Sequence, residues 1–187
     1  GQGYIQTTPL QLCLMTAQIA NGGYKIKPKI IVNDDPLSLE NAKTAMELQS
    51  LQTPNTKLFN DPKNIKIVQE AMFSSTNEQF GTSYRSRIDD PKYQFAGKTG
   101  TAQVKRISKR ERELDLKLEQ IPYKDRDHAL YVAYGPYKNP RYALSIIVEH
   151  GGSGSKAAAP MAKELFKLII DRDELRDKQS NFENINI

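Results

Sequence analysis

Lys98, Thr99, Gly100 and Thr101 place a cation, two hydroxyls and a residue without a side chain at four successive positions. If the segment is a strand, Lys98 and Gly100 should point to one face and the two threonines to the other. Gly100 would let a ligand or another backbone approach closely. Such an edge could hydrogen-bond an extended peptide, hold its carboxylate, and offer a backbone N–H to a developing oxyanion.

A lysine followed by threonine and glycine is, taken alone, more often a surface turn than a functional strand. The flanking residues favour the functional interpretation, because Gly97 precedes the triplet and Thr101, Ala102 and Gln103 follow it. Small and hydroxyl-bearing residues therefore occupy successive positions of one short strand. A hairpin and a closing helix are expected further along the chain.

The elements that must position this strand can be predicted from caps, periodicity and turn residues. Thr8-Pro9 and Asp61-Pro62 read as helix starts, with helical spacing as far as residues 20 and about 80. Glycine, proline and asparagine residues between 135 and 140 predict a turn between two β-rich runs. We expect an active-site strand over 93–104, an antiparallel hairpin over 128–150, and a closing helix over 157–171 whose apolar face is Ala158, Met161, Leu165, Leu168 and Ile169.

The remaining segments read as connections. They are an edge strand or extended segment over 24–32, a polar insertion over 33–60 with one short helix at 38–51, a charged solvated loop over 105–127, and a polar tail over 172–187. Strands followed by a helix, with further helices before them, predict an α+β layer arrangement around an antiparallel sheet. Residues 1–171 then form a single unit with the tail attached.

The composition fits one globular domain, with 187 residues of which 38% are hydrophobic and 26% charged. A net charge of +5 is spread along the chain, so nucleic-acid binding is not expected. The longest apolar stretches, 142–148 and 157–162, are far shorter than the ~20 residues of a membrane-spanning helix. The abrupt start at Gly1 suggests a piece of something longer. Cys13 is the only cysteine, which excludes an internal disulfide and favours a small buried hydrophobe.

Several ordered blocks of the sequence resemble class B penicillin-binding proteins, and within that family the cell-elongation branch called penicillin-binding protein 2. The blocks are Gly1-Gln2-Gly3-Tyr4, Thr8-Pro9-Leu10-Gln11, Ala20-Asn21-Gly22-Gly23, Ala96 to Ala102, Arg126-Asp127-His128-Ala129-Leu130, Ala133-Tyr134-Gly135-Pro136-Tyr137 and Glu149-His150-Gly151-Gly152. The resemblance implies part of the penicillin-recognising serine transpeptidase and β-lactamase-like fold. It covers the chain apart from the two insertions and the tail.

The resemblance also implies roles for the residues of the strand. Lys98 would support the electrostatics and proton traffic of the site, and the hydroxyls of Thr99 and Thr101 would bind the carboxylate of a stem peptide or β-lactam. The backbone N–H of Thr101 would complete an oxyanion hole, Gly100 would leave room for the substrate, and Gln103 would line the substrate groove. The serine nucleophile would lie upstream, and no metal or cofactor would be needed.

Two segments imitate the family's other motifs. Ser153-Gly154-Ser155-Lys156 has the Ser-x-x-Lys pattern, but it follows the Lys-Thr-Gly strand whereas the family's nucleophile precedes it, so we expect a loop entering the last helix. Ser75-Thr76-Asn77 has the Ser-x-Asn pattern, and we expect a helix C-terminal turn. His128 and His150 are too few for a metal cluster and should lie at strand ends.

By resemblance, the parent protein would be a peptidoglycan D,D-transpeptidase, and this chain alone would be inactive without the serine. Its expected partners are stem peptides, β-lactams, the rest of the same domain, a polytopic membrane glycosyltransferase and rod-shape scaffold proteins. Its expected place is the periplasmic side of the bacterial inner membrane, anchored by an upstream segment. Two alternatives stay open: a module that binds peptidoglycan peptides or β-lactams without turnover, and a serine β-lactamase.

Overall fold

The computed structural model describes residues 5–28, 56–105 and 116–185, with side chains up to residue 175. Within these ranges the chain forms an antiparallel sheet in the order β1-β2-β3. The strands are β1 (Ala96–Ala102), β2 (His128–Gly135) and β3 (Tyr142–Val148). Gly97 pairs with Ala133 and Thr99 with Tyr131, which fixes the register of β1 on β2. A strand and an antiparallel hairpin therefore lie where the sequence predicts them, but the strand is shorter than the predicted 93–104.

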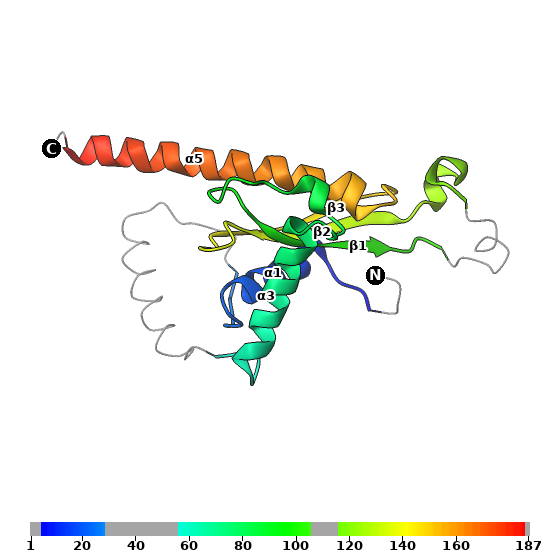
Figure 1. The fold of residues 1–187 in the computed structure, drawn as a ribbon, viewed down its shortest axis with the longest axis horizontal. Helices are drawn as coiled ribbons and strands as arrows, with labels where there is room; N and C mark the ends of the chain where they lie inside the picture. The colour runs from blue at the N-terminus through cyan, green and yellow to red at the C-terminus, as the bar shows by residue number, and fades with distance from the viewer. Residues whose placement is uncertain (1–4, 29–55, 106–115, 186–187) are drawn as a thin grey trace.

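Helices cover both faces of the sheet (Figure 1). Helices α1 (Pro9–Ala20) and α3 (Pro62–Asn77) lie on one face, and α5 (Ala159–Ile185) lies along the other. This is the α+β arrangement that the sequence predicts. Within the described residues α5 is the longest helix, but neither it nor any other has the uninterrupted apolar length that a bilayer crossing requires.

The starts of α1 and α3 are set by their own sequences. The Thr8 hydroxyl accepts the N–H of Gln11 at 3.2 Å, and the Gln11 side chain accepts the Thr8 N–H at 2.8 Å, which is a capping box. At α3, the Asp61 carboxylate accepts the N–H of Lys63 at 2.9 Å, and proline occupies the first turn as in α1. Both helices begin at the positions predicted.

Helices α1 and α3 are also joined to each other. The Gln69 side-chain amide donates to the carbonyl oxygens of Ile19 at 2.7 Å and Ala20 at 3.3 Å. These carbonyls belong to the last turn of α1, where carbonyls lack donors within the helix, and that of Ile19 also accepts the Gly22 N–H at 3.2 Å. One side chain of α3 therefore holds the C-terminal end of α1.

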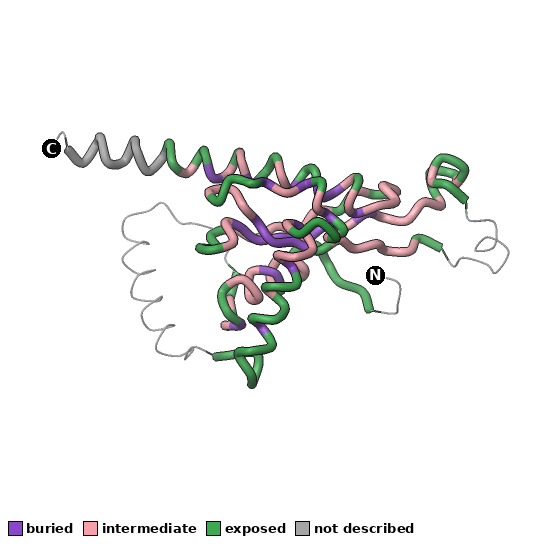
Figure 2. Tube along the Cα trace, viewed as in Figure 1, coloured by how far each residue is buried: buried purple, intermediate pink, exposed green. Residues whose placement is uncertain are grey.

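The core divides into two clusters, one on each face of the sheet, and Figure 2 shows the buried residues concentrated along the strands and the helix faces that meet them. On the α5 face Phe95 stacks on Phe166 with ring centroids 4.9 Å apart and meets Tyr131 edge-on. The other buried members of this cluster are Ile88, Ala133, Ala158, Ala159, Ala162 and Ile170. On the opposite face Met72, Ala96 and Tyr134 are buried beneath α1 and α3.

The closing helix differs from its prediction in its buried face and in its length. Met161 and Leu168 are 51% and 66% exposed, and Ala159, Ala162 and Phe166 are buried in their place. Ala158 of the predicted face is buried, but within α5 the inward stripe is Ala159, Ala162, Phe166 and Ile170. The helix also continues to Ile185. The predicted tail over 172–187 is thus helical as far as 185, because it contains no proline or glycine that would end a helix.

Three further segments can be compared with their predictions. Tyr24 forms only an isolated bridge with Lys57, so the described part of the extended segment at 24–32 is not a strand. The helix expected at 38–51 lies outside the described residues. The predicted charged loop contains short 3-10 turns at Leu118–Gln120 and Tyr123–Asp125. Residues 153–156, predicted as a loop entering the last helix, lie mostly in a π-helical turn at Gly154–Ala158.

Candidate active site

Strand β1 is an edge strand, since β2 is the only strand that pairs with it in the described part of the chain. Its other edge meets the end of α3, where the hydroxyl of Thr76 accepts the Gly97 N–H at 3.0 Å. Backbone directions alternate along a strand, so the N–H groups of Thr99 and Thr101 point out from the sheet on the same side as that of Gly97. The Thr101 N–H therefore lies along the open edge.

Hydroxyl groups gather around Lys98 at this edge. The Lys98 ammonium donates to the Thr99 carbonyl at 2.8 Å and lies 3.4 Å from the Thr99 hydroxyl. The Thr99 hydroxyl is 3.4 Å from that of Thr82, which is 3.2 Å from that of Ser75. Successive side chains of a strand point to opposite faces, which would separate Lys98 from Thr99. At the edge of the sheet, however, the Lys98 side chain reaches around to the Thr99 carbonyl and hydroxyl. They therefore present one cation and one hydroxyl together.

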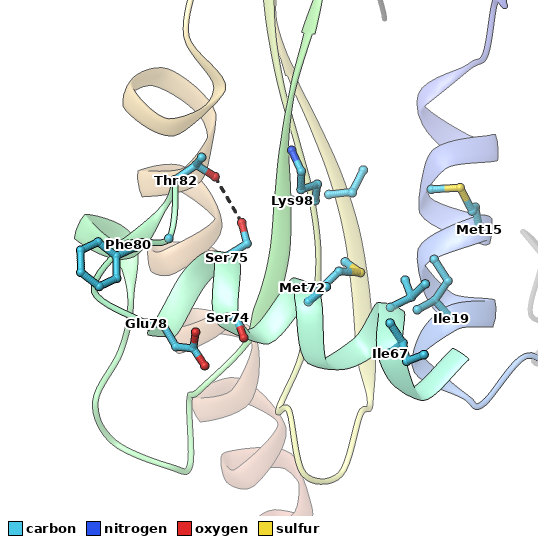
Figure 3. Close-up of a pocket in the computed structure, with 14 residues that line it drawn as sticks. Met15, Ile19, Ile67, Met72, Ser74, Ser75, Glu78, Phe80, Thr82 and Lys98 are labelled. Atoms are coloured by element: carbon cyan, nitrogen blue, oxygen red, sulfur yellow. Dashed lines mark hydrogen bonds between the residues drawn. The ribbon is translucent and has the colours of Figure 1, made fainter. Parts of the chain in front are cut away.

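A pocket of about 640 Å³ opens beside this cluster. Figure 3 shows Lys98 reaching from β1 into it, with Thr82 and Ser75 hydrogen-bonded on one side. Apolar side chains line the part between the helices, among them Met15, Ile19, Ile67 and Met72. A charged head group at the edge of an apolar space is the usual combination of a ligand site, where a few polar groups orient what the apolar walls bury.

Of the residues that the sequence predicts for the site, only Lys98 lines the pocket, and Thr99 is joined to it by the contact with the Lys98 ammonium. Lys98 is exposed, Thr99, Gly100 and Thr101 are partly buried along β1, and Gln103 follows directly after the strand. The space around Gly100 is limited on the sheet side, where an added Cβ would lie 3.3 Å from the Leu130 Cβ.

Two further hydroxyl residues lie at the site: Thr82, which the sequence analysis does not name, and Ser75, which it names only as the start of the Ser-x-Asn imitation. They lie 17 and 24 positions before Thr99, and only the fold brings them next to it. The signal that could have indicated them is the run of serine and threonine over 74–83 shortly before the Lys-Thr-Gly strand.

The two imitations of the family's motifs have the structural roles expected of them. Ser153 precedes the turn into α5, and its hydroxyl pairs with that of Ser155 at 3.1 Å. Ser75-Thr76-Asn77 closes α3, and the Asn77 side-chain amide donates to the Phe95 carbonyl at 2.9 Å. Neither places a serine against Lys98 as a nucleophile.

The two histidines lie at strand ends, as predicted. His128 begins β2, and its Nδ1 accepts the backbone N–H of His150 at 2.9 Å. The His150 Nδ1 is 3.0 Å from the Arg126 carbonyl oxygen. Among the described residues no three potential ligands come together in a way that could hold a metal ion.

The site can bind an extended ligand along β1 and neutralise its negative charge. Lys98 offers a cation, Thr99 and Thr82 offer hydroxyls, and the Thr101 N–H points to the edge of β1 that carries no strand among the described residues. An antiparallel sheet covered by helices on both faces, with a Lys-Thr-Gly edge strand, defines the class of penicillin-recognising acyl-transfer proteins.

Comparison with known proteins agrees with this class. The sequence matches the penicillin binding protein transpeptidase domain over residues 1–167, and the chain belongs to that family. It is 34% identical to the peptidoglycan D,D-transpeptidase MrdA of Salmonella typhimurium over 173 residues, which is 91% of this chain and 26% of that protein. The MrdA of Acinetobacter baumannii is 36% identical, with 89% of this chain and 23% of that protein covered. The chain thus spans about a quarter of the length of these curated relatives.

Solved structures give the same result. Penicillin-binding protein 2 of Pseudomonas aeruginosa, determined in complex with WCK 5153, superposes with a TM-score of 0.61 at 32% identity, covering 90% of this chain and 31% of that one. Penicillin-binding protein 2 of Helicobacter pylori, determined in complex with MreC, gives 0.63 at 30% identity, with coverage of 90% and 26%. The predicted resemblance to penicillin-binding protein 2 is confirmed.

Proposed function

We propose that this chain is the part of a peptidoglycan D,D-transpeptidase that carries the Lys-Thr-Gly strand, and that the serine nucleophile lies upstream of it. The observation that carries the proposal is the open edge of β1, where Lys98 lines a pocket beside the sheet and its ammonium lies 3.4 Å from the Thr99 hydroxyl. Membership of the transpeptidase family over residues 1–167 supports it.

Each residue of the strand then has a defined task. The carboxylate of a D-Ala-D-Ala stem peptide or of a β-lactam is held by the hydroxyls of Thr99 and Thr101 and by the Lys98 ammonium. The Thr101 N–H stabilises the oxyanion that develops on the attacked carbonyl. Gly100 leaves room for the substrate, and Gln103 extends the groove past the end of β1.

The reaction is serine acyl transfer. The upstream serine hydroxyl attacks the carbonyl between the two D-alanines and loses its proton to a base, the C–N bond breaks, and D-alanine leaves with that proton on its amine. An amine from a neighbouring stem peptide then attacks the acyl-enzyme, forms the cross-link and returns the proton to the serine. A β-lactam would be trapped at the acyl-enzyme stage. Lys98 would supply positive charge and take part in the proton movements of this cycle.

The partners and location follow the same proposal. The solved complex of a similar protein with MreC supports a rod-shape scaffold protein as a partner of the parent molecule. We further propose a polytopic membrane glycosyltransferase as a second partner, with the domain on the periplasmic side of the bacterial inner membrane and an upstream segment as its anchor. The remainder of the transpeptidase domain would complete the pocket beside α1 and α3.

The proposal is tested by labelling the complete protein with a fluorescent penicillin. Lys98→Ala should slow labelling by about a hundredfold, which is the size of a lost proton-transfer or charge contribution. Lys156→Ala is the matched control, because Lys156 is also exposed but belongs to the Ser-x-x-Lys imitation at the start of α5. Full labelling of Lys98→Ala, or equal loss in both variants, would contradict the roles assigned here.

The same protein separates the two alternative functions. A chromogenic β-lactam should be opened once per molecule by a transpeptidase, whereas a β-lactamase turns it over continuously. A binding module would retain penicillin without forming a covalent adduct that survives denaturation. Release of D-alanine from a stem-peptide substrate would then establish the transpeptidase.

A further inference from the structure

The edge of β1 is held by side chains before it reaches the candidate site. Asn77 donates to the Phe95 carbonyl at 2.9 Å, and Thr76 accepts the Gly97 N–H at 3.0 Å. Both residues end α3, so the helix end satisfies backbone groups that a neighbouring strand would otherwise pair. These two contacts end at Gly97, one residue before Lys98, and the edge of β1 beyond Gly97 is left for a ligand.

The Thr76 hydroxyl is itself fixed by a buried network. It lies 2.9 Å from the Tyr131 hydroxyl, which is 3.1 Å from that of Ser83, and Ser83 donates to the Ser75 carbonyl at 3.0 Å. Thr76, Ser83 and Tyr131 are at most 1% exposed. Water therefore does not replace these contacts, and the loss of one member would leave its partners unsatisfied.

All four short contacts are hydrogen bonds in only one arrangement of protons, in which the carbonyl oxygens of Met72 and Gly97, each 3.4 Å from the Thr76 hydroxyl, receive no proton from it. The Ser75 carbonyl can only accept, so Ser83 donates to it, Tyr131 donates to Ser83, and Thr76 donates to Tyr131. The Thr76 oxygen is then left to accept from the Gly97 N–H. Burial raises the pKa of Tyr131, which keeps the phenol protonated and able to donate. The chain of donors runs in one direction, so its members reinforce each other.

We propose that Thr76 is a positioning residue for the active-site strand, acting through the backbone of Gly97 to set the place of Lys98. The proposal rests on the function proposed above. The Thr76 hydroxyl does not hydrogen-bond Lys98; its partners are Gly97, Tyr131, Ser83 and Met72. Its hydroxyl does what the neighbouring strand of a larger sheet would do. Rigid support of this kind determines whether a catalytic group sits within reach of its target.

The test compares three variants of the complete protein. Thr76→Val keeps the branched shape but removes the donor and the acceptor, whereas Thr76→Ser keeps both. Thr16→Val is the matched control: Thr16 is also fully buried in a helix, and its hydroxyl donates to the Leu12 carbonyl at 2.8 Å, away from β1. Penicillin labelling is followed over a range of concentrations, so that affinity and the acylation rate constant are obtained separately.

We expect Thr76→Val to lower the acylation rate constant by at least about tenfold, since small misplacements at an active site cost up to about a hundredfold. Thr76→Ser and Thr16→Val should acylate at nearly the wild-type rate. Hydrogen exchange of the peptide that contains Gly97 should be faster in Thr76→Val and unchanged in Thr16→Val. Slower acylation and faster hydrogen exchange in Thr76→Val, but not in Thr16→Val, would support the proposal.

Other outcomes overturn it. Acylation of Thr76→Val at the rate of Thr16→Val would show that the hydroxyl does not position the site, and equally slow Thr76→Ser and Thr76→Val would assign the effect to packing. If Thr76→Val does not fold, Tyr131→Phe removes the next donor in the chain, and wild-type acylation by a folded Tyr131→Phe would refute the network. Failure of wild-type protein to label at all would instead refute the proposed function.

Discussion

The ring of Tyr131 occupies the space that a side chain at Gly97 would need. A Cβ on Gly97 would lie 2.8 Å from the Tyr131 Cε1 and closer still to the Cζ and the hydroxyl oxygen. Real Cβ atoms do not approach other atoms so closely. The glycine before Lys98 is therefore required by the fold, because Tyr131 must pass over it to reach Thr76 and Ser83.

Gly97→Ala should consequently lower the free energy of unfolding by about 1–3 kcal/mol, as overpacking of a buried site does. Acylation should fall with it, since the ring or the strand must move. In a Tyr131→Leu background the same alanine should cost less, because the ring that it meets is gone. Urea unfolding of the four proteins of this cycle measures the coupling.

Gly100→Ala should reduce acylation with little change in stability, unlike Gly97→Ala. Its Cβ would lie 3.3 Å from the Leu130 Cβ, which needs only a slight shift. The new methyl group lies on the face of the sheet to which Lys98 points, beside the proposed path of the ligand, so acylation should fall while the unfolding midpoint stays close to wild type. A loss of stability as large as that of Gly97→Ala would show that both glycines serve packing.

Asp171 should make folding depend on acid pH. Its carboxylate accepts from the Tyr93 hydroxyl and pairs with Lys92 at 3.1 Å, and these contacts lower the pKa of Asp171. A carboxylate with a lowered pKa stabilises the folded state above its unfolded pKa, and this contribution is lost as pH falls below about 4 and through the lowered folded value. Asp171→Asn keeps the amide oxygen for Tyr93 but removes the charge.

The unfolding free energies of wild type and Asp171→Asn, measured from neutral to acid pH, should therefore differ by a constant amount near neutrality and converge as the pH falls. Lys63→Ala, at the first turn of α3, provides a charge change away from this contact. A difference that persists unchanged into acid would mean that the Asp171 charge does not contribute.

Cys13 should react slowly with alkylating agents in the folded protein. Burial raises the pKa of its thiol, and its Sγ lies 3.4 Å from the Ala143 carbonyl oxygen as a donor. The thiolate is the reactive form, so iodoacetamide should modify Cys13 much more slowly at neutral pH than after denaturation. Mass spectrometry of the peptide that contains Cys13 measures this. Equal rates in folded and denatured protein would contradict the burial of the thiol.

Features encoded by a few adjacent residues could be predicted from the sequence. Thr8-Pro9 and Asp61-Pro62 each carry a cap and a proline in one place, and both helices begin there. The hairpin was equally local, because the turn residues at 135–140 separate two β-rich runs. The range predicted for the Lys-Thr-Gly strand, 93–104, is too long. Tyr93 lies in a turn instead, where its N–H donates to the Asp90 carbonyl at 3.0 Å.

Features that depend on distant partners could not be predicted. The buried stripe of α5 is Ala159, Ala162, Phe166 and Ile170, whereas hydrophobicity alone favours Leu165 and Leu168. The contact of Thr76 with Gly97 joins residues 21 positions apart, and Ser75-Thr76-Asn77 could be recognised only as a helix end. Polar contacts of this kind leave no periodic pattern in a sequence.

Helix α3 is fastened at two points. The Gln69 side chain donates to the last carbonyls of α1. Thr76, two turns or about 10 Å further along the helix, accepts the N–H of Gly97, just before Lys98. A helix is stiff over that length, so α3 connects α1 rigidly to the edge of β1 that carries Lys98. We expect a disturbance at the C-terminal end of α1 to change the position of Lys98 through α3.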